Sequence, residues 1–208
     1  MDTFHSKSAF VYRQVRRALR SGRYTPGQRL DPAKLAAKYR ISPTPVRFAL
    51  YRLVGEALVV DQARDGLHIP LLTEVALRGL YDWMERLLLM ACDIGAAPMA
   101  KKPKPLTFAF GDDLIKPTWQ LFDAVARVTI HRPLHDAVKQ ANDRLAPIRR
   151  TEQELLEHTF EELSELNQHW RVHDSPALKS ALHNYHERRK QLVPCIVAVL
   201  NDRSDALR

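Results

Sequence analysis

LAAKYRISPTPVRFALYRL, residues 35–53, is the stretch of sequence that decides the fold. Its second half places apolar residues at i, i+3, i+4 and i+7, the spacing of one helical face: Val46, Ala49, Leu50 and Leu53. The opposite face carries hydrogen-bonding side chains: Thr44, Arg47 and Tyr51. Ser42 occupies the position of an N-cap, and Pro43 and Pro45 fall in the first turn, where a missing N–H costs little. The segment predicts a helix with one buried and one polar face.

A second, shorter helix is predicted just upstream. Asp31 and Pro32 form another cap-and-proline start, and the inner face that follows consists of Leu35, Ala36 and Tyr39. The two helices then meet across a tight turn near Arg40 and Ile41. Two short helices joined in this way are typical of a helix-turn-helix, whose second helix enters the major groove of DNA.

The flanking segments complete a winged helix. Apolar residues at helical spacing predict a first helix over residues 10–20, whereas the polar residues 1–9 are expected to form a loose arm. After Gly55, the apolar residues of 58–60 and 67–69 flank an Asp65-Gly66 turn, and this pattern predicts a small β-hairpin. Three helices followed by a hairpin make a winged helix-turn-helix.

The chain has 208 residues, enough for one or two domains, and its charge is unevenly distributed. Residues 1–75 hold 13 Lys and Arg against 6 Asp and Glu, and residues 76–208 hold 19 against 18. The net charge of +8 therefore divides into +7 and +1. A basic N-terminal part joined to a nearly neutral one suits a polyanion-binding domain attached to a different kind of domain.

The remainder of the chain is predicted to be entirely helical. Thr73 caps a helix to about Ile94, whose wide apolar stripe, including Val75, Trp83 and Met90, indicates burial on more than one side. A linker is expected over 95–111, with helices over 112–129 and 133–145. Thr151 and Glu154 form a capping box, and Ser175-Pro176 begins a last long helix with a kink at Pro194. We predict a mainly α protein, with a winged helix-turn-helix over 1–72 and an all-helical effector-sensing and dimerisation bundle over 73–208.

Cysteine usage and hydropathy indicate a cytoplasmic protein. Cys92 and Cys195 match no metal-ligand spacing and are expected to be reduced, mostly buried thiols. The longest apolar runs, around 87–92 and 193–200, are too short to span a bilayer, and residues 1–30 contain no apolar signal core.

Several motifs in the first third resemble the DNA-binding domain of the GntR family of bacterial transcription regulators. They are PGQRL at 26–30, LAAKYRIS at 35–42, TPVRFALYRLVGEALV at 44–59 and DGLHI at 65–69. The helical remainder more faintly resembles the sensing domain of the FadR-type branch. The resemblance implies a homodimer that binds an inverted repeat, with each recognition helix in a major groove and each wing at the neighbouring minor groove.

The resemblance also assigns DNA-contacting positions. With the exposed face and the wing, the candidate DNA-binding residues are Lys34, Ser42, Thr44, Arg47, Tyr51, Arg64 and Gly66. Arg47 can bind a guanine edge or a phosphate, and Gly66 allows a tight turn. Two positions depart from the family pattern. This sequence has Pro43 where the family usually has an arginine, and Phe48 where it usually has a glutamate. Phe48 could contact a thymine methyl or pack against the protein. The first helix adds arginines that either contact phosphates or form a solvated face: Arg13, Arg16, Arg17 and Arg20.

The sensing domain keeps little of its branch's pattern. That branch holds a divalent metal with one Asp and three His, and the matching positions here are Trp119, Asp123, Leu163 and His186. Asp123 and His186 are therefore the weak candidates for effector binding, and no metal site is predicted, because most of the usual ligands are missing. Met84 and Leu88 replace an arginine and a glutamate that often anchor a carboxylate.

Three functions remain open from the sequence. The first is a regulator, expected to be a repressor, whose partners are double-stranded DNA, a second copy of the chain and a small-molecule effector. The second is a small metal-dependent hydrolase that would use His169, His173, His183 and His186 with Glu161, Glu162 and Glu165. The ordinary alternative to this hydrolase site is that these side chains are solvated or hydrogen-bonded surface residues, which is the more common situation for histidines and glutamates on helices. The third is a winged-helix adaptor that binds protein.

Overall fold

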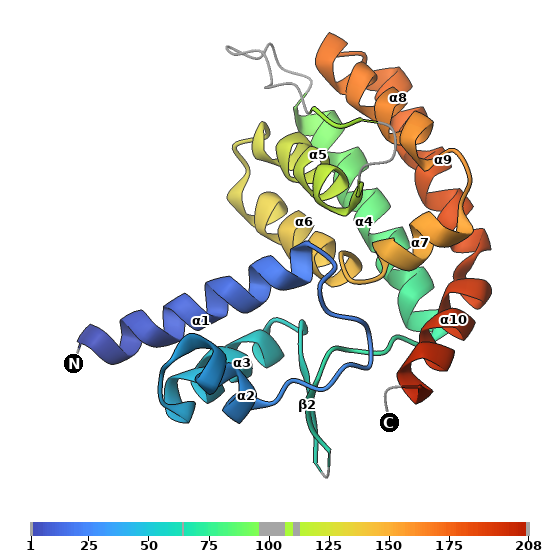
Figure 1. The fold of residues 1–208 in the computed structure, drawn as a ribbon. Coiled ribbons are helices and arrows are strands. Elements are labelled where there is room, and N and C mark those ends of the chain that lie inside the picture. The colour runs from blue at the N-terminus through green and yellow to red at the C-terminus, as the bar shows by residue number, and fades with distance from the viewer. Residues whose placement is uncertain (1, 64, 96–106, 110–112, 207–208) are drawn as a thin grey trace.

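The computed structural model describes residues 2–63, 65–95, 107–109 and 113–206, with side chains from Ser6 onward. The fold is mainly helical, with an N-terminal winged helix-turn-helix and seven further helices in the described residues (Figure 1). The first part consists of α1 (Asp2–Arg20), α2 (Pro32–Tyr39), α3 (Pro43–Gly55), β1 (Val60–Gln62) and β2 (Gly66–His68). The second consists of α4 (Glu74–Ile94), α5 (Ile115–Arg127), α6 (Arg132–Leu145), α7 (Arg149–Leu155), α8 (Thr159–Val172), α9 (Ser175–Gln191) and α10 (Val193–Asp205).

The N-terminal core forms around the predicted stripe of α3. Val46, Ala49, Leu50 and Leu53 are all 0% exposed. They pack in one cluster with the inner face of α1, namely Val11, Val15 and Leu19. The helix period of α3 therefore separates a fully buried face from an exposed one, as the sequence predicts.

Local contacts and backbone conformation define both ends of α2 and the start of α3. The Asp31 carboxylate accepts hydrogen bonds from the N–H groups of Ala33 and Lys34, at 2.7 and 3.3 Å. Arg40 ends α2 in the left-handed conformation, with φ of 53°. Ser42 stands at the N-cap position of α3, but its hydroxyl makes no capping hydrogen bond, which differs from the predicted cap.

The wing is a short antiparallel hairpin with a third segment beside it. Val60 pairs with His68 and Gln62 with Gly66, whose φ of +82° is a conformation that favours glycine. The strands are shorter than predicted, since residues 58 and 59 belong to the core cluster before β1 begins. A sheet partner absent from the prediction is residues 28–30, whose backbone exchanges hydrogen bonds with residues 67–69.

The expectation of a loose arm over residues 1–9 is wrong, because α1 is helical from Asp2. No glycine or proline lies within residues 2–20 to stop the helix. The ring of Phe10 also packs edge-on against that of Tyr39, with centroids 5.7 Å apart. The helix therefore extends well beyond the segment that carries the clear apolar period.

The C-terminal core is built on α4, which Figure 1 shows running through the middle of the other helices. Thr73 caps α4 as predicted, accepting a hydrogen bond from the N–H of Ala76 at 3.2 Å. Leu77, Met84 and Leu88 are 0% exposed. Burial on more than one side is only partly correct, because three residues of the wide stripe lie in solvent: Val75 (83% exposed), Trp83 (51%) and Met90 (50%).

Three local predictions in the C-terminal part are wrong. The Thr151–Glu154 capping box does not form, because Thr151 is buried inside α7 and both side chains bind Arg203. The last long helix is two helices, since α9 ends at Gln191 and Pro194 lies in the first turn of α10. Cys195 is exposed, while Cys92 is buried.

Most of the predicted linker, 96–106 and 110–111, lies outside the described residues. None of the helices in the described part is long and apolar enough to cross a membrane.

One buried carboxylate joins the winged helix to the C-terminal helices. The Asp143 side chain of α6 is 0% exposed. It accepts hydrogen bonds from Nε of Arg16 and Nε of Arg20, both at 2.6 Å, and from Nε1 of Trp119 at 2.8 Å. The Arg20 guanidinium also lies over the Trp119 ring, 4.1 Å from a ring centroid. A Cβ atom added to Gly27 would collide with the Ser204 side chain, a second close approach between the two parts.

Replacing Asp143 should destabilise the whole chain. Asp143→Asn keeps the side-chain shape but removes the charge that faces two partly buried guanidinium groups, and this should cost about 3 kcal/mol of unfolding free energy. Urea denaturation measures the loss. The matched control is Asp136→Asn on the same helix. The Asp136 side chain is 63% exposed, and its Oδ2 lies 3.8 Å from Nε of Arg132. A surface pair of this kind contributes about 0–1 kcal/mol. Equal stability of the two variants would contradict the proposed role of Asp143.

Candidate nucleic-acid interface

The polar face of α3 is exposed to solvent. Thr44, Arg47, Phe48 and Tyr51 are exposed, with Phe48 at 59% and Tyr51 at 54%. They stand on the side of α3 away from the buried stripe. Arg52, also exposed, is held differently, because its guanidinium lies 4.0 Å from the Tyr12 ring centroid and its Nε is 3.4 Å from Glu56 Oε1. Arg47 is thus the arginine of α3 that is placed within the exposed face.

The first turn of α3 offers few backbone donors. Of its first three residues, Pro43, Thr44 and Pro45, only Thr44 has an N–H group. A helix N-terminus attracts anions through such N–H groups and through its dipole. Side chains must therefore provide most of the hydrogen bonds here. Ser42 is exposed and its hydroxyl is not engaged in capping, so it is available for that role with Thr44.

The remaining predicted positions surround α3. Lys34 is exposed on α2, where it lines an open groove with Arg29 and Lys38. Gly66 forms the turn of the wing. A Cβ added there would meet nothing closer than the Arg29 side chain, 3.9 Å away, so the requirement for glycine is conformational and not steric. Arg64 lies outside the described residues. In Figure 1 the hairpin projects away from the C-terminal helices.

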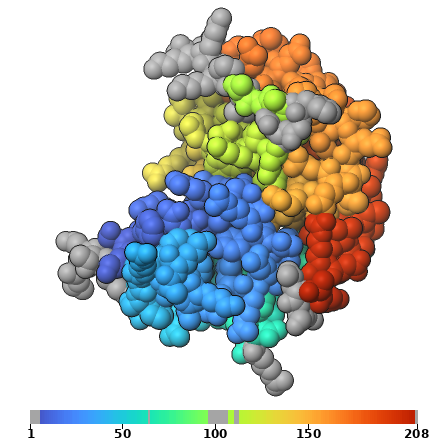
Figure 2. All heavy atoms as spheres, in the orientation of Figure 1, coloured from blue at the N-terminus to red at the C-terminus, as the bar shows by residue number. Residues whose placement is uncertain are grey.

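Exposed basic side chains occur on all three helices of the N-terminal lobe, which is drawn from blue to cyan in Figure 2. The exposed ones in the described residues are Lys7, Arg13, Arg17, Arg23, Arg29, Lys34, Lys38, Arg40, Arg47 and Arg52. Arg16 and Arg20 are not among them, because both face α6 and bind Asp143. These two arginines therefore neither form a solvated face nor are free to contact phosphates, the two roles considered for the arginines of α1. The sequence offers no local signal for a partner 123 or more residues away.

The two weak effector candidates lie inside the C-terminal helices with separate partners. Asp123 is 3% exposed and binds Nε2 of His135, at 2.8 Å, and Arg127. His186 is 0% exposed, and burial lowers its pKa to about 3. Its Nδ1 lies 2.7 Å from the carbonyl oxygen of Leu182, so the neutral ring donates there. In the part of the chain that the structure describes, the two residues share no metal-binding group.

The histidines of the hydrolase alternative do not form one site. His186 is buried, whereas His183 pairs with Glu85 and His169 lies one helical turn from Glu165, 3.5 Å away. His173 ends α8 in the left-handed conformation. Glu162 is not solvated either, because it binds Arg188 and Arg189.

Sequence reasoning missed a buried ionic cluster in the C-terminal helices. Arg189 of α9 is 3% exposed and its Nε lies 2.8 Å from Glu152 Oε2. The Tyr81 hydroxyl donates to the other oxygen of Glu152 at 2.6 Å. Burial, followed by the charge of Glu152, raises the pKa of Tyr81, so this hydroxyl stays a donor. The cluster links α4, α7 and α9, and nothing in the local pattern marks its members as buried.

Comparison with known proteins identifies the N-terminal part. Residues 7–69 match the family described as "Bacterial regulatory proteins, gntR family". Among curated proteins, no significant match is found. Among the solved structures that resemble the fold, two do so over nearly their full length. E. coli McbR/YncC is 18% identical with a TM-score of 0.65, covering 95% of this chain and 98% of its own. A putative transcriptional regulator GntR from Rhodococcus sp. RHA1 is 16% identical with a TM-score of 0.68, covering 90% and 97%.

The matched segment contains α2, α3, both strands and most of α1, and therefore the whole exposed face described above. The family consists of regulators and not of enzymes, and the match therefore argues against the hydrolase alternative. Residues 7–69 of this chain are therefore a DNA-binding domain of the GntR family of bacterial transcription regulators.

Proposed function

We propose that this regulator is a repressor of the FadR-type branch that binds an inverted-repeat operator as a homodimer in the bacterial cytoplasm. The observation that carries the proposal is the exposed face of α3, because it combines Thr44, Arg47 and Tyr51 on a helix whose other face is fully buried. Such a helix is rigidly held and can enter a major groove without rearrangement.

The residue types on this face assign distinct roles. The Arg47 guanidinium is suited to bind a guanine edge with two hydrogen bonds, or a phosphate. Ser42 and Thr44, at the start of α3, are suited to phosphates, as is Lys34 on α2. Phe48, more than half exposed, offers an apolar surface to a thymine methyl. At the wing, Gly66 permits close approach to the backbone, and we assign Arg64 to the minor groove.

A homodimer would bring two such helices to two half-sites, and an apolar stripe on α4 supports self-association. Its residues are Val75, Trp83, Met90 and Ile94, which are between 43% and 83% exposed. Exposed apolar patches on a helix commonly mark protein contacts, and we assign this one to a second copy of the chain. A small-molecule effector would release DNA by favouring a spacing of the two winged helices that does not fit the operator.

Truncating the reading side chains should weaken DNA binding without unfolding the protein. Arg47→Ala should lower the affinity for the DNA upstream of the protein's own gene about 10- to 100-fold, because a bidentate contact contributes about 1–3 kcal/mol. Thr44→Ala should lower it roughly fivefold, the loss of about 1 kcal/mol for one hydrogen bond. Fluorescence anisotropy over a range of salt concentrations measures both affinity and the number of phosphate contacts.

The control is Arg132→Ala, which removes an arginine side chain that is 92% exposed on α6, outside the winged helix. It should leave DNA affinity within error of the native value. Unchanged affinity and unchanged salt dependence in Arg47→Ala would show that α3 does not read DNA in the proposed way.

The dimer should form through α4. At micromolar concentration the native chain should sediment as a dimer, and Trp83→Glu should shift it toward the monomer, because the substitution places a charge in the apolar stripe. Val172→Glu is the matched control, since Val172 is an apolar residue 64% exposed on α8. A native chain that sediments as a monomer would contradict the dimer, and equal effects of both substitutions would contradict its location.

A further inference from the structure

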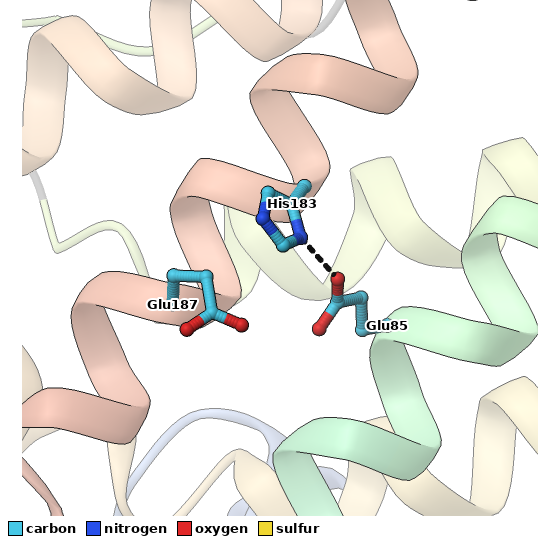
Figure 3. Close-up of side chains that lie close together, drawn as sticks. All are labelled: Glu85, His183 and Glu187. Carbon is cyan, nitrogen blue, oxygen red and sulfur yellow. Dashed lines mark hydrogen bonds and ion pairs between the residues drawn. The ribbon is translucent and has the colours of Figure 1, made fainter.

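Three potential metal ligands converge between α4 and α9, on residues with no role in the DNA interface. Figure 3 shows Glu85 of α4 facing His183 and Glu187, which lie one helical turn apart on α9. One ligand atom from each residue lies within 4.8 Å of the other two. His183 Nδ1 is 2.7 Å from Glu85 Oε1. The group does not include Asp123 or His186, so it differs from the positions that the family resemblance singles out.

The surroundings of this group carry excess negative charge. Lys190 Nζ lies 2.9 Å from Asp82 Oδ1 and 3.0 Å from Glu85 Oε2, and it also contacts Glu187. Three carboxylates thus share one ammonium group, so these four residues carry a formal net charge of −2. A divalent cation would neutralise that excess.

The cation would not have to displace Lys190 from Glu85. Glu85 directs Oε1 toward His183 and Oε2 toward Lys190, so its two oxygens serve different partners. A metal at Oε1 would replace the hydrogen bond between Glu85 and His183. The Glu85 residue is only 8% exposed, so one ligand is already fixed by packing while the two on α9 are more accessible.

We propose that Glu85, His183 and Glu187 form a zinc-class metal site that ties α9 to α4. One imidazole and two carboxylates suit Zn²⁺ and neighbouring transition ions, whereas Mg²⁺ and Ca²⁺ prefer oxygen ligands alone. Three protein ligands leave the fourth position of a tetrahedral ion to water. The bound ion would hold together two helices that are 98 residues apart in sequence.

The test uses the full-length protein, freed of metal with EDTA and titrated with zinc chloride. Calorimetry should give one Zn²⁺ per chain, and zinc should raise the Tm. Co²⁺ in its place should give the visible absorption bands of a four-coordinate site. The double variant His183→Gln, Glu187→Gln should bind Zn²⁺ at least about tenfold more weakly, since even groups that only support a ligand contribute about 10–100-fold. Circular dichroism checks that the variant folds.

The matched control is His169→Gln, Glu165→Gln, because this pair on α8 has the same one-turn spacing and an N–O distance of 3.5 Å. No third ligand accompanies that pair among the described residues. The control should bind zinc like the native chain. Native affinity in the His183, Glu187 variant, or equal losses in both variants, would overturn the proposal, as would stoichiometry well below one. These readouts do not involve DNA, so they succeed or fail independently of the proposed repressor function.

Discussion

A single carboxylate with no exposed surface, that of Asp143, controls how the two parts of this regulator are placed. A buried charge is costly to remove from water, and it persists only where charged partners and hydrogen bonds surround it. Arg16, Arg20 and Trp119 provide them. Two of these three partners come from α1, so the position of α1 against α6 is defined by directional contacts and not by apolar packing alone.

The same helix connects this junction to α3, whose exposed face is proposed to read DNA. One face of α1 packs Val11, Val15 and Leu19 against α3, and the adjacent face directs Arg16 and Arg20 to α6. A shift of α6 would therefore act on α1 directly, and on α3 through α1. These contacts would give events in the C-terminal helices, such as binding of a ligand, a metal ion or a second subunit, a physical route to the exposed face of α3.

Local chemistry explains what the sequence predicts well and what it does not. The winged helix follows from features that depend only on residues near one another in sequence. These are the cap at Asp31, the alternation of buried and exposed residues on α3, and the turn at Gly66. Ser42 shows the limit even there, since a good capping residue at the right position makes no cap bond. Thr151 and Glu154 fit a capping box, yet Arg203, about 50 residues away, takes both side chains. Tertiary partners override local preference in such cases.

The candidate sites divide in the same way. The exposed residues of α3 follow from a periodic pattern, so sequence alone finds them. Asp143 with its arginines, and Glu85 with His183 and Glu187, depend on helices that approach each other only after folding, and no spacing in the sequence marks them. The residues carried over from the sensing domain, Asp123 and His186, instead bind separate partners.

The central claim is that two copies of α3 read a symmetric DNA site in successive major grooves. Methylation protection on genomic fragments that the native protein selects tests it most directly, because the reagent attacks guanine N7 in the major groove. We predict two protected clusters on one face of the DNA, related by a twofold axis and centred about 10 base pairs apart. A single protected cluster, or selected fragments with no protected guanines and no shared sequence, would contradict the claim.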